Sequence, residues 1–65
     1  MLLTIKEASE QLHVNPNYVY KLIRLGFLPA LKLGSLKIRP EALDEFLKTY
    51  EGQDVDALII EKEVS

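Results

Sequence analysis

The chain contains no cysteine, and this absence excludes disulfide bonds and thiolate metal sites. Its longest apolar run is the four residues from Ala57 to Ile60, which is too short to cross a membrane. The single histidine, His13, has no cysteine or paired acid at ligand spacing, so we expect a surface or capping residue. No glycine-rich phosphate loop and no nucleophile motif is present. These absences predict a protein that is not an enzyme and needs no metal or cofactor.

The net charge of −2 hides an uneven distribution along the 65 residues. Residues 1–40 carry six basic and two acidic side chains, whereas residues 41–65 carry two basic and eight acidic ones. The apolar fraction of 48% is typical of a globular domain, here a single one close to the lower size limit. A basic front half can still bind phosphates, provided that the fold keeps the acidic half away from them.

Signals for two short helices, separated by a turn, occupy the first third of the chain. Thr4 and Glu7 have the spacing of a capping box, which predicts a helix that runs to about residue 12. Asn15 suits an N-cap, Pro16 suits the first position of a second helix, and Gly26 suits its left-handed end. Two helices joined by such a turn form the helix-turn-helix pattern, with a generic helical hairpin as the alternative.

The second predicted helix has two chemically distinct faces. Val19, Leu22 and Ile23 recur at helical spacing and predict the buried face. The opposite face carries an amide, a phenol, an ammonium and a guanidinium group, from Asn17, Tyr20, Lys21 and Arg24. This polar stripe suits the major groove of DNA, and the alternative is an ordinary amphipathic surface helix.

Apolar and basic residues then alternate on both sides of Gly34-Ser35, which predicts a two-stranded hairpin. Because Gly-Ser suits a two-residue type II′ loop, we predict that Lys32 faces Lys37 across the hairpin. The apolar residues of the two strands, from Leu31 to Ile38, then share the other face. Facing lysines repel each other, so their pairing favours a site beside phosphates; a lysine-protected solvent edge is the alternative.

A third helix is predicted to begin at Pro40 and to end near Gly52. Its regular apolar positions predict the face that closes the core: Leu43, Phe46, Leu47 and Tyr50. We therefore divide the chain into a domain of residues 1–52 and an acidic tail of residues 53–65. The tail is predicted to dock on the core, to form a short helix, or to stay mobile until a partner binds.

This order of elements predicts a mainly α fold with a small β-hairpin, a winged helix-turn-helix. Five segments carry a family resemblance: LTIKEA (3–8), VNP (14–16), VYKLIR (19–24), GFLPALKLG (26–34) and KIRPEAL (37–43). As a set they resemble the excisionase-like and MerR-like DNA-binding domains of bacteria, phages and mobile elements, over about residues 2–50. The resemblance implies that the second helix enters the major groove and that the wing strands follow the backbone or the minor groove.

We expect the DNA contacts to come from the second helix and the wing. Lys21 and Arg24 suit base edges, Arg24 preferring guanine, and Asn17 suits adenine or a phosphate. The tyrosine hydroxyls of this helix suit phosphates, although packing against the first helix is an equal alternative for Tyr18. The remaining candidates are Tyr20, Lys32, Lys37 and Arg39.

The leading function is sequence-specific double-stranded DNA binding without catalysis, by an excisionase-type recombination directionality factor. Excisionases are commonly little more than this domain. The alternatives are a small transcriptional regulator of the same fold and a protein-interaction module that binds an integrase or polymerase through its acidic helix and tail. One domain contacts few phosphates, so we expect neighbouring copies on repeated sites or an integrase partner. We expect no membrane association and a cytoplasmic location in a bacterial or phage-infected cell.

Overall fold

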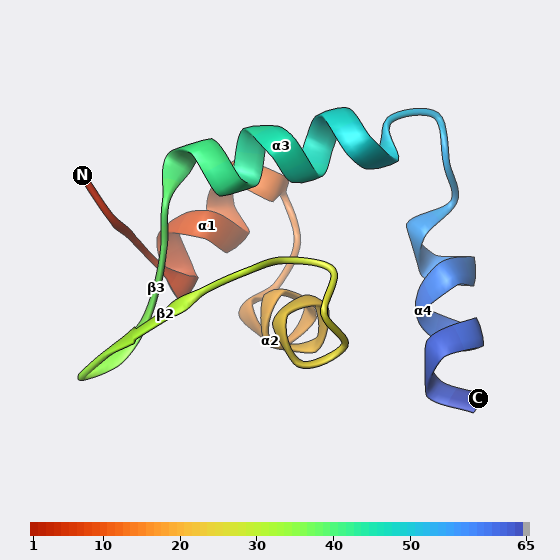
Figure 1. Ribbon diagram of the computed structural model, residues 1–65, viewed down its shortest axis with the longest axis horizontal. Coiled ribbons are helices and arrows are strands. Elements are labelled where there is room, and N and C mark those ends of the chain that lie inside the picture. Colours follow the sequence, from red (N-terminus) through yellow and green to blue (C-terminus); the bar gives the residue numbers. More distant parts are fainter. Residues whose placement is uncertain (65) are drawn as a thin grey trace.

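Four helices and a three-stranded sheet form the computed structural model, which describes residues 1–64 (Figure 1). Helix α3 lies across the top of the molecule, over α1 and α2, and α4 stands beside the far end of α3. Ser65, the last residue of the predicted tail, lies outside the described residues. The elements in chain order are β1 (Leu3–Thr4), α1 (Ile5–Leu12), α2 (Pro16–Arg24), β2 (Leu31–Leu33), β3 (Ser35–Ile38), α3 (Pro40–Tyr50) and α4 (Val55–Val64).

Helix α1 begins at the predicted capping box. The Thr4 side chain accepts the Glu7 backbone N–H at 3.1 Å, and the Glu7 carboxylate accepts the Thr4 backbone N–H at 2.8 Å. At the other end His13 is exposed and adopts the left-handed conformation, with φ of 58°. The N–H groups of His13 and Val14 then donate to the carbonyl groups of Glu10 and Ser9, which closes the last turn of the helix.

Helix α2 begins and ends at the residues that the sequence predicts. The Asn15 side chain accepts the Tyr18 backbone N–H at 3.0 Å, and Pro16 takes the first helical position. Gly26 has a φ of 88°, and the Phe27 N–H donates to the Leu22 carbonyl at 2.9 Å. This is a Schellman ending, which requires a residue without a Cβ penalty at the left-handed position.

The core lies between α1, α2, α3 and the inner face of the sheet. Val19 and Leu22 of α2 are almost fully buried there, as predicted. Leu47 was predicted to lie in the core but is 51% exposed, because the buried face of α3 is rotated toward Ala42, which is 7% exposed. The buried apolar residues are Leu3, Ile5, Ala8, Val19, Leu22, Leu28, Ile38, Ala42, Leu43, Phe46 and Ile59.

The sheet contains a strand that the sequence patterns did not indicate. β1 pairs with β3 in antiparallel fashion, with Leu3 opposite Ile38 and Thr4 opposite Lys37. The strand order is β1-β3-β2, so the two hairpin strands are joined to the start of α1. Only two residues pair in β1, which is too short for an alternating pattern to be visible in the sequence.

The predicted hairpin register is wrong by one residue. Lys32 pairs with Leu36, Leu31 pairs with Lys37, and Leu33 pairs with Ser35, so Lys32 does not face Lys37. Gly34 alone reverses the chain, with φ of 76°, and Ser35 already belongs to β3. A one-residue shift exchanges the faces of a strand. Leu31 and Leu33 therefore lie on the outer face, 43% and 56% exposed.

The acidic tail forms a helix that docks on the domain. An Asp54 oxygen accepts the Ala57 backbone N–H at 3.2 Å in the first turn of α4. Ile59 is 4% exposed and belongs to the core cluster, whereas Ile60 beside it is 61% exposed. Of the three alternatives for this segment, the structure contains a docked helix with one buried anchor.

Candidate nucleic-acid interface

The polar stripe of α2 lines a groove together with the wing. Its walls are formed by Asn17, Tyr20, Lys21, Ile23 and Arg24 of α2 and by Leu36 of β3. The stripe is held outward because Val19 and Leu22, on the opposite face, are fixed in the core. α2 therefore presents amide, phenol, ammonium and guanidinium groups together on one open surface, with a wing strand as its flank.

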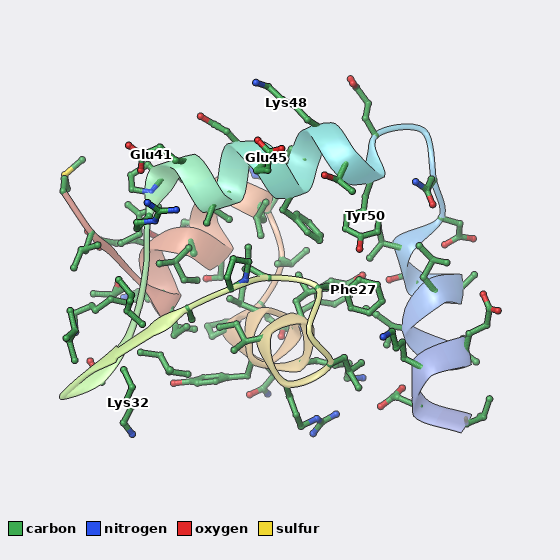
Figure 2. All side chains as sticks on the ribbon, in the orientation of Figure 1. Phe27, Lys32, Glu41, Glu45, Lys48 and Tyr50 are labelled. Atoms are coloured by element: carbon green, nitrogen blue, oxygen red, sulfur yellow. The ribbon has the colours of Figure 1, made fainter. Side chains whose placement is uncertain are left out.

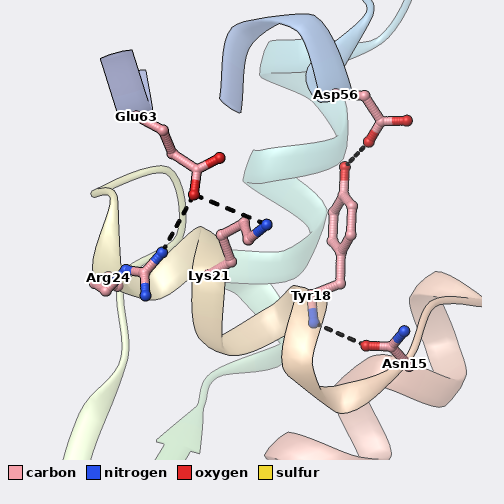
Figure 3. A network of polar contacts seen from close by, with 6 residues as sticks. All are labelled: Asn15, Tyr18, Lys21, Arg24, Asp56 and Glu63. Atoms are coloured by element: carbon pink, nitrogen blue, oxygen red, sulfur yellow. Dashed lines mark hydrogen bonds and ion pairs between the residues drawn. The ribbon is translucent and has the colours of Figure 1, made fainter. Parts of the chain in front are cut away.

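The two cations of this stripe share an anion from α4. Oε2 of Glu63 lies 3.9 Å from Nζ of Lys21 and 3.6 Å from a guanidinium nitrogen of Arg24 (Figure 3). The side chains of Lys21 and Arg24 are 41% and 67% exposed, so both remain open to solvent as well. Exposed pairs of this kind are weak, about 1 kcal/mol or less each.

Tyr18 of α2 contacts the beginning of α4. Its hydroxyl donates to a carboxylate oxygen of Asp56 at 2.5 Å (Figure 3). Partial burial, together with the hydrogen bond to Asp56 and the negative charges of Asp56 and Asp54, raises the pKa of Tyr18 to about 12. The Tyr18 hydroxyl, predicted as a phosphate contact, is therefore engaged by α4, and its ring packs against the core.

Sequence reasoning missed Asp56 and Glu63 as functional neighbours of α2. A signal for them was present, because the two acids are seven residues apart and lie on one face of a helix. The acidic excess of residues 41–65 also complements the basic excess of residues 1–40. The sequence did not indicate that the chain after Gly52 turns back and places α4 beside α2.

The basic residues of the wing lie on different faces of the sheet. Lys32 is exposed and pairs with Leu36, so it shares the face that borders the α2 groove. Figure 2 shows the Lys32 side chain pointing away from α3. Lys37 lies on the opposite face, where its Nζ donates to the Ser35 hydroxyl at 2.6 Å. Arg39, two residues further along, is exposed at the start of α3. Lys32 thus shares a sheet face with Leu36, the wing residue of the α2 groove, whereas Lys37 lies on the opposite face.

Two acidic side chains of α3, Glu41 and Glu45, lie apart from this surface. In Figure 2 Glu41, Glu45 and Lys48 lie at α3, at the top of the molecule, and Lys32 projects from its lower side. All three α3 side chains are exposed. The fold therefore separates this part of the negative charge from the α2 stripe, whereas α4 brings Glu63 onto it.

Within residues 1–64, no group of three or more His, Cys, Asp or Glu side chains is placed to hold a metal ion. No helix in that range is both long enough and apolar enough to span a bilayer.

Comparison with known proteins supports the interpretation of α1 and α2. Comparison with curated proteins and with solved structures gave no match. A family model described as a helix-turn-helix domain matches residues 2–51, which include α1, the turn, α2, the wing and α3. The match supports DNA binding, in agreement with the mainly helical fold and its small antiparallel sheet. The chain therefore belongs to the helix-turn-helix domain family.

Proposed function

We propose that this protein binds duplex DNA in a sequence-specific manner, with α2 in the major groove and the wing beside it. The observation that carries the proposal is the shared groove of α2 and β3, in which Asn17, Tyr20, Lys21 and Arg24 are gathered on one surface. A major groove is about 12 Å wide and admits one α-helix, and each base pair displays a distinct hydrogen-bonding pattern there.

The side chains of the stripe have separate roles in this complex. Arg24 is the most exposed cation of α2 and donates in a bidentate manner to guanine O6 and N7. Asn17 lies in the first turn, where it pairs with an adenine edge or a phosphate. Lys21 and Tyr20 hold the neighbouring phosphates, and Lys32 extends these contacts along the wing.

The test is a pair of charge-neutralising substitutions, Arg24→Gln and Lys48→Gln. Both remove one positive charge, but Lys48 projects from the far side of α3 (Figure 2). A target duplex selected from random DNA is titrated with each variant and followed by fluorescence anisotropy. We expect Arg24→Gln to weaken binding about 5- to 150-fold, the value of one bidentate base contact, and Lys48→Gln to weaken it less than about twofold. Equal affinity of the two variants would exclude groove recognition by α2.

Within this DNA-binding function, we propose that the protein is an excisionase-like recombination directionality factor. It is supported by the resemblance of residues 2–50 to excisionase-like and MerR-like domains. An excisionase bends its DNA, so the selected duplex is placed at varying positions within a longer fragment and the mobility of the complexes is compared. Position-dependent mobility supports the recombination role. Binding without bending favours a small transcriptional regulator.

One domain with few phosphate contacts binds weakly, so occupancy depends on neighbours. We propose that copies on repeated sites, or an integrase or recombinase, supply the additional contacts in the cytoplasm of a bacterial or phage-infected cell. Retained partner binding in a variant that has lost DNA affinity would instead favour a protein-interaction module.

A further inference from the structure

Helix α4 places a carboxylate beside the two α2 cations that are proposed to contact DNA. Lys21 and Arg24 are the only cations of α2, and both lie within 4 Å of the same oxygen of Glu63. They also belong to the groove that we propose as the DNA surface. A phosphate oxygen that approaches these two groups therefore competes with Glu63 for the same donors.

The position of α4 strengthens this competition. Glu63 lies in the last turn of α4, so the negative end of the helix dipole is close to the same cations. Near the beginning of α4, Asp56 accepts the Tyr18 hydroxyl and ties the helix to α2 a second time. Asp56 and Glu63 thus hold α4 beside α2 at two separated points (Figure 3).

Few contacts attach α4 to the rest of the domain. Ile59, 4% exposed, is its one buried residue, Val55 packs at the edge of the core, and the Lys62 ammonium lies 5.9 Å from the centroid of the Phe27 ring. Ile60 and Val64 are 61% and 81% exposed. The ion pairs of Glu63 are exposed and contribute little each. DNA offers several phosphates and base edges in exchange for one carboxylate, so α4 lowers the affinity without preventing binding.

We infer that α4 is an autoinhibitory helix, which engages the two recognition cations of α2 through Glu63, is attached beside them through Asp56, and must yield when DNA binds. The inference rests on the proposed DNA-binding function. It predicts that removal of the Glu63 charge increases DNA affinity, with a matched removal of charge elsewhere on α4 having little effect.

The experiment compares Glu63→Gln with Glu61→Gln in the full-length chain. Both changes remove one negative charge from the last turns of α4, but Glu61 borders a different groove, beside Phe27 and Tyr50. Both side chains are exposed, so the fold is expected to survive either change. Affinity is measured by fluorescence anisotropy on the duplex selected from random DNA, over a range of salt concentrations.

We expect Glu63→Gln to bind about three- to tenfold more tightly than Glu61→Gln, which is the range of one or two exposed ion pairs. Asp56→Asn, which weakens the second attachment, should change affinity in the same direction.

The Arg24→Gln variant distinguishes failure of the autoinhibition from failure of the proposed function. If Arg24→Gln loses affinity but the two glutamate variants bind equally, the proposed function stands and autoinhibition by α4 is refuted. If Arg24→Gln binds as tightly as the unmodified chain, binding of α2 in the major groove is refuted, and autoinhibition by α4 is refuted with it. An independent readout is amide hydrogen exchange of residues 55–64, which should accelerate when DNA saturates the protein. Unchanged protection would show that α4 does not yield.

Discussion

The observed hairpin register predicts that the two wing lysines contribute unequally to DNA binding. Lys32 pairs with Leu36 and therefore shares the face beside the α2 groove, whereas Lys37 lies on the outer face and bonds to Ser35. Substituting each lysine by glutamine removes the same charge from neighbouring strands. The pair of variants therefore separates a local phosphate contact from a general change of net charge.

The expected magnitude follows from counterion release. Each phosphate contact contributes about −0.9 to the slope of log K against log salt, and its electrostatic contribution vanishes near 1 M salt. At 0.1 M salt one contact is therefore worth a factor of 10 raised to 0.9, about eightfold. We expect Lys32→Gln to lose about eightfold in affinity and about 0.9 in slope, and Lys37→Gln to lose less than twofold.

The assay is fluorescence anisotropy with the selected duplex at several salt concentrations between about 50 and 200 mM, the range over which phosphate contacts are resolved. Circular dichroism of both variants checks that the sheet is intact. Equal losses in the two variants would refute the reasoning, because they would place both lysines at the same phosphates. That result would agree with the facing lysines that the alternating sequence pattern predicts.

Three further predictions concern the fold. His13→Gly should increase the free energy of unfolding by about 0.5–1 kcal/mol in urea denaturation, because it removes left-handed strain at φ of 58°, and His13→Ala should not. Leu22→Ala should lower the same free energy by about 2–5 kcal/mol, because Leu22 is 1% exposed; a loss below about 1 kcal/mol would contradict its place in the core. Burial and the acids Asp56 and Asp54 raise the folded-state pKa of Tyr18 to about 12, so its stabilising contribution is complete below pH 10 and is lost as the pH rises toward 12. Tyr18→Phe should therefore show a smaller fall in stability between pH 9 and pH 11 than the unmodified chain.

Local signals in the sequence were sufficient for the helices of the DNA-binding half. The capping box at Thr4, the Asn15 cap and the glycine at residue 26 all appear where they were expected. These signals act within a few residues, through backbone groups that must be satisfied at each helix end. The buried stripe of Val19 and Leu22, and with it the outward polar stripe, follows from helical periodicity alone.

The wing shows where local signals become insufficient. Apolar and basic residues alternate on both strands, so the pattern alone favours apolar residues facing apolar ones, whereas the observed register pairs Leu31 with Lys37 and Lys32 with Leu36. The turn at Gly34 and the pairing of Leu3 with Ile38 select the observed register. The pairing partner lies 35 positions away in the sequence, beyond the reach of any local pattern.

The sequence by itself determined that this protein has a helix-turn-helix with a polar second helix, because caps and periodicity depend only on neighbouring residues. The tertiary structure decided which wing lysine joins that helix and where the acidic tail returns. Glu63 meets Lys21 and Arg24 because Ile59 is buried in the core and fixes the path of α4. Charged side chains that are far apart in the chain interact only when packing of the core brings their helices together.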